Sequence, residues 1–349
     1  MKTLVSSILA LFLLFPALAP ADVTGGSAAG QEAGGAGAED GPEARFGLAR
    51  RYYLGQGVPL DQARALEMTR ALAEEGHAPA QVELGRFHMA GEAVPMDPGQ
   101  ALEWFGKAAG QGLAEAQFLL GTMLYQGQDV PRDMEAALGW WKLAAGQGHA
   151  DAQANLGAVH YAGDGVERDY AEALRWYHQA AENGHPEAQG ALADMLYNGK
   201  GTARDPARAL GWWRMAADGG DAKALTILGG FYFNGNEVPE DKAEGLRLWT
   251  LAAQAGDPYA QHNLGSAHFN GQGTERDVDA AIAWYRMAAD QGLDIAQYNL
   301  GLIHLGEEGG RRDPAEARRL LGLAAGQGVR QARALLERMD EEAGGPVEP

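Results

Sequence analysis

The chain repeats one pattern of apolar and polar positions every 36 residues, and residues 152–187 show it clearly. In the first half of this copy, apolar or small side chains stand at Ala152, Leu156 and Val159–His160. That spacing places them on one face of a helix. A large apolar residue, Tyr161, ends the helix, and a glycine-rich turn follows it. The pattern therefore predicts a short amphipathic helix that leads into a turn.

The second half of the copy predicts another helix. It begins at Asp169, and apolar residues follow at Ala173–Leu174, Trp176–Tyr177 and Ala180–Ala181, again at helical spacing. In three other copies, proline follows the equivalent aspartate, at Pro98, Pro206 and Pro314. An aspartate that caps the helix, followed by proline at the first helical position, is a typical helix start, and losing such a cap costs about 1 kcal/mol. Glycine closes every copy and supplies the left-handed residue that ends the helix.

No insertion interrupts the register over eight copies, so the sequence predicts an all-α array of about eight helix–turn–helix repeats. The leucine equivalent to Leu156 is present in every copy, and the next residue is always Gly or Ala, which permits close helix packing. One helix pair leaves its apolar face exposed, so neighbouring pairs must stack to bury it. A polar closing helix, from Gln331 to Arg338, is expected to cap the array.

Tryptophan recurs in the second helix of most copies, often beside another aromatic residue. Its fixed register predicts packing in the core rather than stacking on sugars, with the second aromatic residue of some pairs partly exposed. The tryptophans are Trp104, Trp140, Trp141, Trp176, Trp212, Trp213, Trp249 and Trp284.

The segments outside the array differ in composition. Residues 1–19 resemble a secretory signal, because Lys2 precedes an apolar run that is shorter than the ~20 residues a membrane span needs. We expect cleavage after Ala19, and export to the periplasm or beyond the cell. Residues 20–43 are rich in Gly and Ala and predict a disordered linker, residues 44–339 form the repeat array, and residues 340–349 predict a disordered acidic tail.

The chain has no cysteine and a formal net charge of −19. It can form no disulfide, and lipid attachment through cysteine is excluded. Its charge disfavours nucleic acids and anionic lipid surfaces as partners.

No group of residues predicts catalysis, a cofactor or a metal site. Ser27 and Ser266 are the only serines after the predicted signal, and Ser266 lacks the Ser-x-x-Lys spacing of penicillin-binding proteins. Histidine stands at the same repeat position of the first helix in four copies. Histidines of adjacent copies could supply two metal ligands, but no third ligand is evident, so packing explains these histidines better than a metal site does. They are His88, His160, His268 and His304. Arginines before the capping aspartates, such as Arg132 and Arg204, favour a solvated face or local pairing over anion binding.

The repeat unit resembles the Sel-one-like repeat, a relative of the tetratricopeptide repeat. The residues that carry the resemblance are Ala152-Gln153, Leu156-Gly157, Gly163, Asp169, Ala173-Leu174, Trp176-Tyr177 and Ala180-Ala181. The resemblance covers residues 44–331 or so. It implies a right-handed α-solenoid and a role in protein interaction, and it implies envelope signalling, polysaccharide export or host contact for exported bacterial members. Some cysteine-containing relatives were labelled β-lactamases, and this chain departs from them because it has no cysteine.

In related solenoids the first helices line the concave side, where variable positions contact partners. The first-helix positions that vary from copy to copy hold large apolar side chains, histidine and asparagine. Asparagine can bind a peptide backbone because its amide both donates and accepts hydrogen bonds. The candidate partner-binding residues are Phe46, Val82, Phe118, Asn155, His262, Asn263, Tyr298 and Asn299.

We therefore expect a non-catalytic, monomeric adaptor in the bacterial envelope that binds a partner protein through its first helices. Two alternatives remain at this stage. One is a cell-wall or β-lactam hydrolase, suggested by the family label, and the other is a structural or carbohydrate-binding component of the envelope.

Overall fold

The computed structural model describes residues 41–306 and 312–343, and these residues form helices joined by turns. The predicted signal, residues 20–40 of the predicted linker and residues 344–349 of the predicted tail lie outside the described residues. The array begins at Pro42 and its last helix reaches Ala343, so it is a few residues longer at each end than the sequence boundaries of 44 and 339. Pro42 stands at the first helical position, where its missing N–H costs no hydrogen bond.

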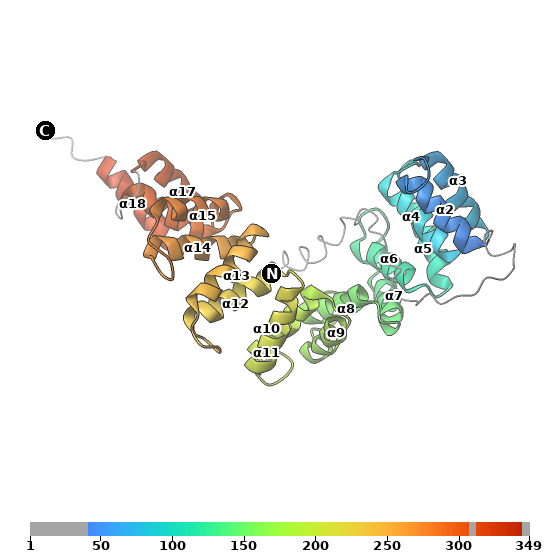
Figure 1. The fold of residues 1–349 in the computed structure, drawn as a ribbon, viewed down its shortest axis with the longest axis horizontal. Coiled ribbons are helices and arrows are strands. Elements are labelled where there is room, and N and C mark those ends of the chain that lie inside the picture. The colour runs from blue at the N-terminus through green and yellow to red at the C-terminus, as the bar shows by residue number, and fades with distance from the viewer. Residues whose placement is uncertain (1–40, 307–311, 344–349) are drawn as a thin grey trace. The chain divides into compact units, whose positions relative to one another are not determined.

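Each repeat contributes a first and a second helix, as predicted (Figure 1). The first helices are α2 (Pro42–Leu54), α4 (Ala78–Ala90), α6 (Ala114–Gln126), α8 (Ala150–Ala162), α10 (Pro186–Asn198), α12 (Ala222–Asn234), α14 (Pro258–Asn270) and α16 (Asp294–Leu305). The second helices are α3 (Gln62–Glu74), α5 (Pro98–Gly110), α7 (Met134–Gly146), α9 (Tyr170–Glu182), α11 (Pro206–Asp218), α13 (Lys242–Gln254), α15 (Val278–Asp290) and α17 (Pro314–Gly326). The closing helix is α18 (Arg330–Ala343).

Local chemistry explains where the second helices begin and end. The predicted aspartate caps every one of them; Asp169, for example, accepts hydrogen bonds from the N–H groups of Ala171 and Glu172 at 2.9 and 3.0 Å. The glycine that closes each repeat has positive φ, as Gly184 does at 82°. Both predictions are confirmed, and both depend only on residues close in sequence.

Where glycine follows the recurring leucine of the first helix, a large side chain of the second helix packs against it. A Cβ atom on Gly121 would lie 2.7 Å from the ring of Trp141, and one on Gly157 would lie 2.8 Å from Tyr177. This contact corrects the sequence interpretation of the aromatic pairs. The second member, such as Trp141, is buried against the glycine, whereas the first member, such as Trp140, is half-buried.

Glutamines connect successive repeats through a buried ladder. The Gln153 side chain donates to the carbonyl of Ala145 in the preceding repeat (3.0 Å), and Asn183 donates to Gln153 Oε1 (2.8 Å) and to Gly148 O (3.3 Å). Equivalent bonds surround Gln117, Gln261 and Gln297. In the repeat at residues 222–257, buried Leu225 and exposed Ala255 occupy the two ladder positions, so these two side chains cannot form the bonds.

The described residues divide into two compact parts, one ending at Ala188 and the other beginning at Gln189. We call them the N-terminal and the C-terminal part and describe each by itself. Buried clusters occur in both, with Trp141, Leu156 and Val159 in one of the N-terminal clusters and Tyr285, Leu300 and Ile303 in one of the C-terminal clusters.

Candidate functional site

The four candidate residues of the N-terminal part are embedded in packing. Val82, Phe118 and Asn155 are buried, and the Phe118 ring stacks on His149 with centroids 4.6 Å apart. Phe46 is half-buried, with its ring centroid 5.2 Å from that of His77. Their role as partner contacts stays a prediction; Val82, Phe118 and Asn155 each expose 9% or less of their surface.

The four candidates of the C-terminal part are half-buried and lie on two neighbouring first helices. His262 and Asn263 are on α14, and Tyr298 and Asn299 are on α16. The Asn299 amide nitrogen is 3.0 Å from His262 Nε2, and His262 Nδ1 is 3.4 Å from Asn263 Oδ1. If the Asn299 amide donates to Nε2, the imidazole proton is on Nδ1 and points to Asn263.

Burial supports this neutral form of the ring. Burial lowers the pKa of His262, and the hydrogen bond with Asn263 opposes that shift more weakly. The structure thus brings together three of the residues that the sequence singled out, and it fixes the direction in which their amides point. Tyr298 instead packs against the cluster around Leu321 and Leu335.

Beside this network lies a hollow of about 270 Å³ between three helices. Asn299 forms part of its wall, and the other lining residues come from α14, α15 and α16. They are Ser266, Phe269, Asn270, Tyr285, Leu302 and Ile303. We call this hollow the α14–α16 pocket.

Hydrogen bonds hold the polar wall of the α14–α16 pocket in place. The Asn270 amide donates to the Ser266 carbonyl (2.9 Å) and to Ser266 Oγ (3.3 Å). Burial raises the pKa of the Tyr285 hydroxyl, against hydrogen bonds with Ser266 and Asn299 that lower it. A chain of contacts therefore runs from His262 through Asn299 and Tyr285 to Ser266.

Sequence reasoning missed Ser266, Asn270 and Tyr285 as pocket residues. It considered Ser266 only as a nucleophile and Tyr285 only as a core aromatic. The one sequence signal for Tyr285 was Gly265, because the aromatic ring packs on that glycine and so comes next to the first-helix surface. No sequence signal pairs Asn270 with Ser266 other than their helical spacing of four residues.

The lining of the α14–α16 pocket carries no charged side chain. It combines amide and hydroxyl groups with the apolar surfaces of Phe269, Leu302 and Ile303. Such a lining suits a neutral group with both hydrogen-bonding and apolar parts, because a buried charge would find no counter-charge here. Peptide backbone and uncharged side chains meet this requirement.

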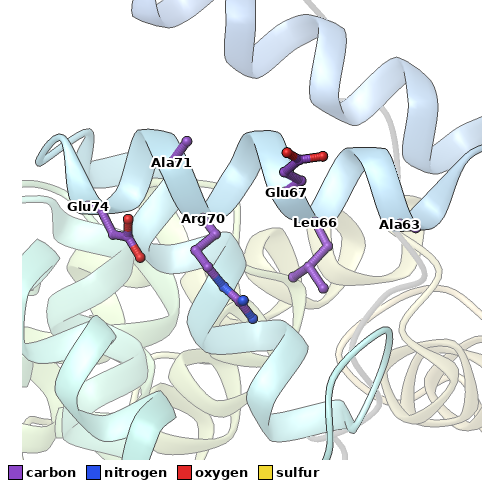
Figure 2. Close-up of a pocket in the computed structure, with 6 residues that line it drawn as sticks. All are labelled: Ala63, Leu66, Glu67, Arg70, Ala71 and Glu74. Atoms are coloured by element: carbon purple, nitrogen blue, oxygen red, sulfur yellow. The ribbon is translucent and has the colours of Figure 1, made fainter.

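A second hollow, of about 310 Å³, lies along α3 in the N-terminal part. All of its lining residues belong to that helix: Ala63, Leu66, Glu67, Arg70, Ala71 and Glu74. Figure 2 shows Leu66, Arg70 and Glu74 on one side of the helix and Glu67 and Ala71 on the other. Because one exposed helix supplies this lining, we do not choose this hollow as the functional site.

The remaining candidates from the sequence have local structural roles. Arg132, Arg204 and Arg276 lie over the rings of Tyr125, Tyr197 and Phe269, which confirms local pairing for these arginines. The four histidines at the shared first-helix position each accept a backbone hydrogen bond from the aspartate that caps the next helix, with N···O distances of 2.8–2.9 Å. They are His88, His160, His268 and His304.

The described residues contain neither a metal-ligand cluster nor a membrane-spanning helix. Within residues 41–306 and 312–343, no three or more His, Asp or Glu side chains gather closely enough to hold a metal ion. In the same residues, no helix has the length and apolar character required to cross a membrane.

Comparison with protein families gives a match over most of the chain. The model of the Sel1 repeat matches eight consecutive segments, and their register agrees with that of the helix pairs. The segments are residues 42–77, 78–113, 114–149, 150–185, 186–221, 222–257, 258–293 and 294–329. No curated protein matches the chain.

Two solved structures are similar in both sequence and fold. The first is c5321, a protective antigen of uropathogenic Escherichia coli strains that displays an SLR fold; it is 35% identical, with a TM-score of 0.76. The match covers 86% of this chain and 64% of that one, so the present chain spans less than two thirds of the antigen's length. The second is a Sel1 repeat protein from Oxalobacter formigenes, which is 31% identical with a TM-score of 0.66 over 85% of this chain and 86% of that one.

Proposed function

Because this chain belongs to the Sel1 repeat family, whose helical solenoids generally mediate protein–protein interaction, we propose that it is a non-catalytic scaffold that binds a partner protein. The partner segment lies across α14 and α16 and places one uncharged side chain in the α14–α16 pocket. One observation carries this proposal: the linked contacts of His262, Asn299, Tyr285 and Ser266 hold polar groups at the wall of an uncharged hollow.

The preorganised amides explain how such a segment would bind. Asn263 and Asn299 each offer a donor and an acceptor to the backbone of a peptide, and their contacts with His262 limit the rotamers that they can adopt. Binding then costs less conformational entropy at the site than it would with freely rotating side chains.

The surroundings of Ser266 give no reason to prefer the hydrolase alternative. Its partners are the Asn270 amide and the Tyr285 hydroxyl, and burial raises the pKa of Tyr285, so the hydroxyl stays protonated and is a poor base. We expect the purified protein to turn over neither nitrocefin nor muropeptides.

We also propose export of the protein to the bacterial periplasm. The apolar run of residues 4–15 after Lys2 supports this location, as does the similarity to an E. coli protective antigen. Cell fractionation tests it: a periplasmic protein that lacks residues 1–19 is expected, and a cytoplasmic protein that retains them would contradict the proposal.

A photoreactive amino acid placed at Asn270, on the rim of the α14–α16 pocket, tests partner binding in living cells. We expect one dominant cross-linked product, and we expect it to weaken strongly when Asn263→Ala and Asn299→Ala are added. The same photoreactive residue at exposed Asn236, in the turn after α12, is the matched control.

Circular dichroism of each variant shows that the helices remain intact. Identical products from positions 270 and 236, or undiminished cross-linking by the double alanine variant, would remove the pocket from the proposed function. With the partner identified and purified, we expect the double variant to raise its Kd about tenfold, which corresponds to about 1.4 kcal/mol.

A further inference from the structure

An earlier repeat shows how the two helices of a repeat use their polar hydrogens when none is left over. In the repeat at residues 114–149, the Trp141 indole N–H donates to Thr122 Oγ1 (3.2 Å). The Thr122 hydroxyl in turn donates to the Phe118 carbonyl of its own helix (2.9 Å). Because the indole only donates, this pair has no hydrogen left for a ligand.

The α14–α16 pocket has two hydroxyl groups at these two repeat positions. Ser266 replaces the threonine and Tyr285 replaces the tryptophan. The hydrogen bond between the two hydroxyls uses one of their two hydrogens. Their oxygens accept from amides: Ser266 Oγ from Asn270 (3.3 Å) and the Tyr285 oxygen from Asn299. The pair therefore keeps one hydroxyl hydrogen that none of these bonds uses.

The backbone of α14 does not accept this hydrogen. A hydroxyl on a helix often donates to the carbonyl four residues earlier, as Thr250 does to Leu246 (2.8 Å). In the part of the chain that the structure describes, Ser266 makes no such bond; its Oγ only accepts, from Asn270. The unused hydrogen of the Ser266–Tyr285 pair is thus available to a ligand in the hollow that both residues line.

Asn299 adds an acceptor beside this donor. Its amide nitrogen is engaged, because it lies 3.0 Å from His262 Nε2 and bonds to the Tyr285 oxygen. Among the described residues, no hydrogen bond reaches Asn299 Oδ1, which keeps its two lone pairs. The wall of the α14–α16 pocket therefore presents one hydroxyl donor and one amide acceptor on residues that touch each other.

The group that fills the pocket has to complement both. An apolar group would take the donor and the acceptor out of water without replacing their bonds, which costs free energy. A charged group would find no counter-charge, and a hydroxyl would have to use one oxygen for both bonds. A primary carboxamide carries its acceptor and its donors on separate atoms side by side, so it pairs with both groups at once.

The apolar part of the lining favours glutamine over asparagine. Phe269, Leu302 and Ile303 form this part, and Tyr285 exposes only 3% of its surface. Glutamine has two methylene groups before its carboxamide, whereas asparagine has one. The longer stem reaches a hydroxyl that is little exposed, and its methylene groups remove more apolar surface from water.

We propose that the α14–α16 pocket binds the side chain of a glutamine in the partner segment. The glutamine carbonyl accepts the unused hydrogen of the Ser266–Tyr285 pair, and its amide donates to Asn299 Oδ1. The second lone pair of Asn299 Oδ1 remains for the backbone of the segment. This inference rests on the scaffold function proposed above and specifies the side chain that the pocket recognises.

Four capped pentapeptides that differ only in their central residue test this recognition. That residue is glutamine, methionine, tyrosine or glutamate, with alanine on both sides. Binding to the full-length purified protein is followed by nuclear magnetic resonance, through the side-chain amide signals of Asn270 and Asn299. We expect the glutamine peptide to bind at millimolar concentration and each of the others more weakly by about fivefold or more, because each of them loses at least one of the two hydrogen bonds.

The double variant Ser266→Ala with Tyr285→Phe shows where the glutamine binds. It removes the unused hydrogen whichever hydroxyl carries it, and it keeps an aromatic ring on Gly265. We expect its Kd for the glutamine peptide to rise about fivefold and its Kd for the methionine peptide not to rise. Tyr177→Phe, whose ring packs on Gly157 in the N-terminal part, is the matched control and should bind all the peptides as the unchanged protein does.

Three outcomes would overturn glutamine recognition: no binding of the glutamine peptide, equal binding of the glutamine and methionine peptides, or a preference for glutamine that the double variant retains. The cross-link from position 270 distinguishes these failures from a failure of the scaffold function. If that cross-link still captures a partner and Asn263→Ala with Asn299→Ala weakens it, only glutamine recognition is wrong. If the cross-link captures nothing, both proposals are wrong.

Discussion

The contact between a glycine of the first helix and an aromatic ring of the second decides how close the two helices of a repeat come. Gly121 meets Trp141, Gly229 meets Trp249, and Gly265 meets Tyr285, each without room for another carbon atom. This contact buries the second aromatic residue of a pair, such as Trp141 or Tyr177, whereas the first is half-buried at Trp140 and buried at Trp176. The contact between Gly265 and Tyr285 also brings Tyr285 into the wall of the α14–α16 pocket.

Substitution of Gly121 by alanine tests this contact. The added Cβ atom would lie 2.7 Å from the Trp141 ring and 3.0 Å from the Ala137 carbonyl, so we expect the free energy of unfolding to fall by about 1–3 kcal/mol. Gly139→Ala in the same repeat is the matched control: it lies in α7 with no atom within 4 Å and should stabilise by about 0.5–1 kcal/mol. Urea unfolding followed by circular dichroism measures both, and equal effects would contradict the role of Gly121.

Residue-scale chemistry was predictable from the sequence only where it is local. The caps formed by Asp169 and its equivalents, and the closing glycines, depend on neighbours within a few residues, and these predictions were confirmed. The burial of Trp141 rather than Trp140 depends on a glycine in another helix, so the interpretation of the pairs was wrong in that detail. The burial of Asn155 could not be predicted either, because it depends on residues distant in the sequence.

At the scale of single helices, histidine caps several of the first helices of the N-terminal part. His77, His149 and His185 accept the N–H of Ala80, Ala152 and Ala188 through Nδ1. In all three, the other ring nitrogen faces a carboxylate of the preceding repeat: Nε2 lies 3.0 Å from Glu43 for His77, 3.1 Å from Glu115 for His149 and 3.3 Å from Asp151 for His185. This motif was not predicted, because the acidic residue belongs to the preceding repeat.

The His149–Glu115 contact makes stability depend on pH. The hydrogen bond from His149 holds the pKa of Glu115 below its ordinary value of 4.5, with help from Arg86 and against burial and Asp151. The unfolded chain therefore binds a proton at Glu115 more readily than the folded chain. This stabilisation is complete above pH 4.5 and is lost as the pH falls through the lower folded pKa.

We expect Glu115→Gln to reduce this acid sensitivity. The midpoint of urea unfolding should fall less between pH 5 and pH 3 in the variant than in the unchanged protein. Glu103→Gln, at an exposed position of α5, is the control and should leave the dependence unchanged. Parallel pH profiles for the unchanged protein and Glu115→Gln would show that this carboxylate contributes nothing.

At the scale of the whole molecule, the array is a sum of equivalent repeats and nearest-neighbour contacts. The helix order and the repeat length followed from the 36-residue period, because every copy keeps its caps and its apolar face. The α14–α16 pocket did not follow in the same way. It arises from Ser266, Asn299 and other residues at variable repeat positions, on a surface that three helices build together.

Deletion of one complete repeat, residues 114–149, tests this additivity. After this deletion, the Gln153 side chain would donate its hydrogen bond to the carbonyl of Ala109. Ala109 occupies the same repeat position as Ala145, the present acceptor of that bond. We therefore expect a folded chain with unchanged helical content per residue and a lower urea midpoint. Deletion of only residues 114–131 would join unlike helices and should reduce ellipticity per residue, and equal behaviour of the two deletions would contradict the nearest-neighbour description.

The glutamine ladder described above is interrupted at Leu225 and Ala255. Apolar packing and exposed side-chain bonds, such as those of Arg204 with Glu237 and of Lys223 with Asp194, still hold this repeat to the preceding one, but the buried pair of ladder bonds is missing there. If the ends of the molecule were pulled apart, we expect the C-terminal part to rupture first beside α12. A solenoid under mechanical load would then open at one contact between repeats and keep the helix pairs on each side of that contact folded.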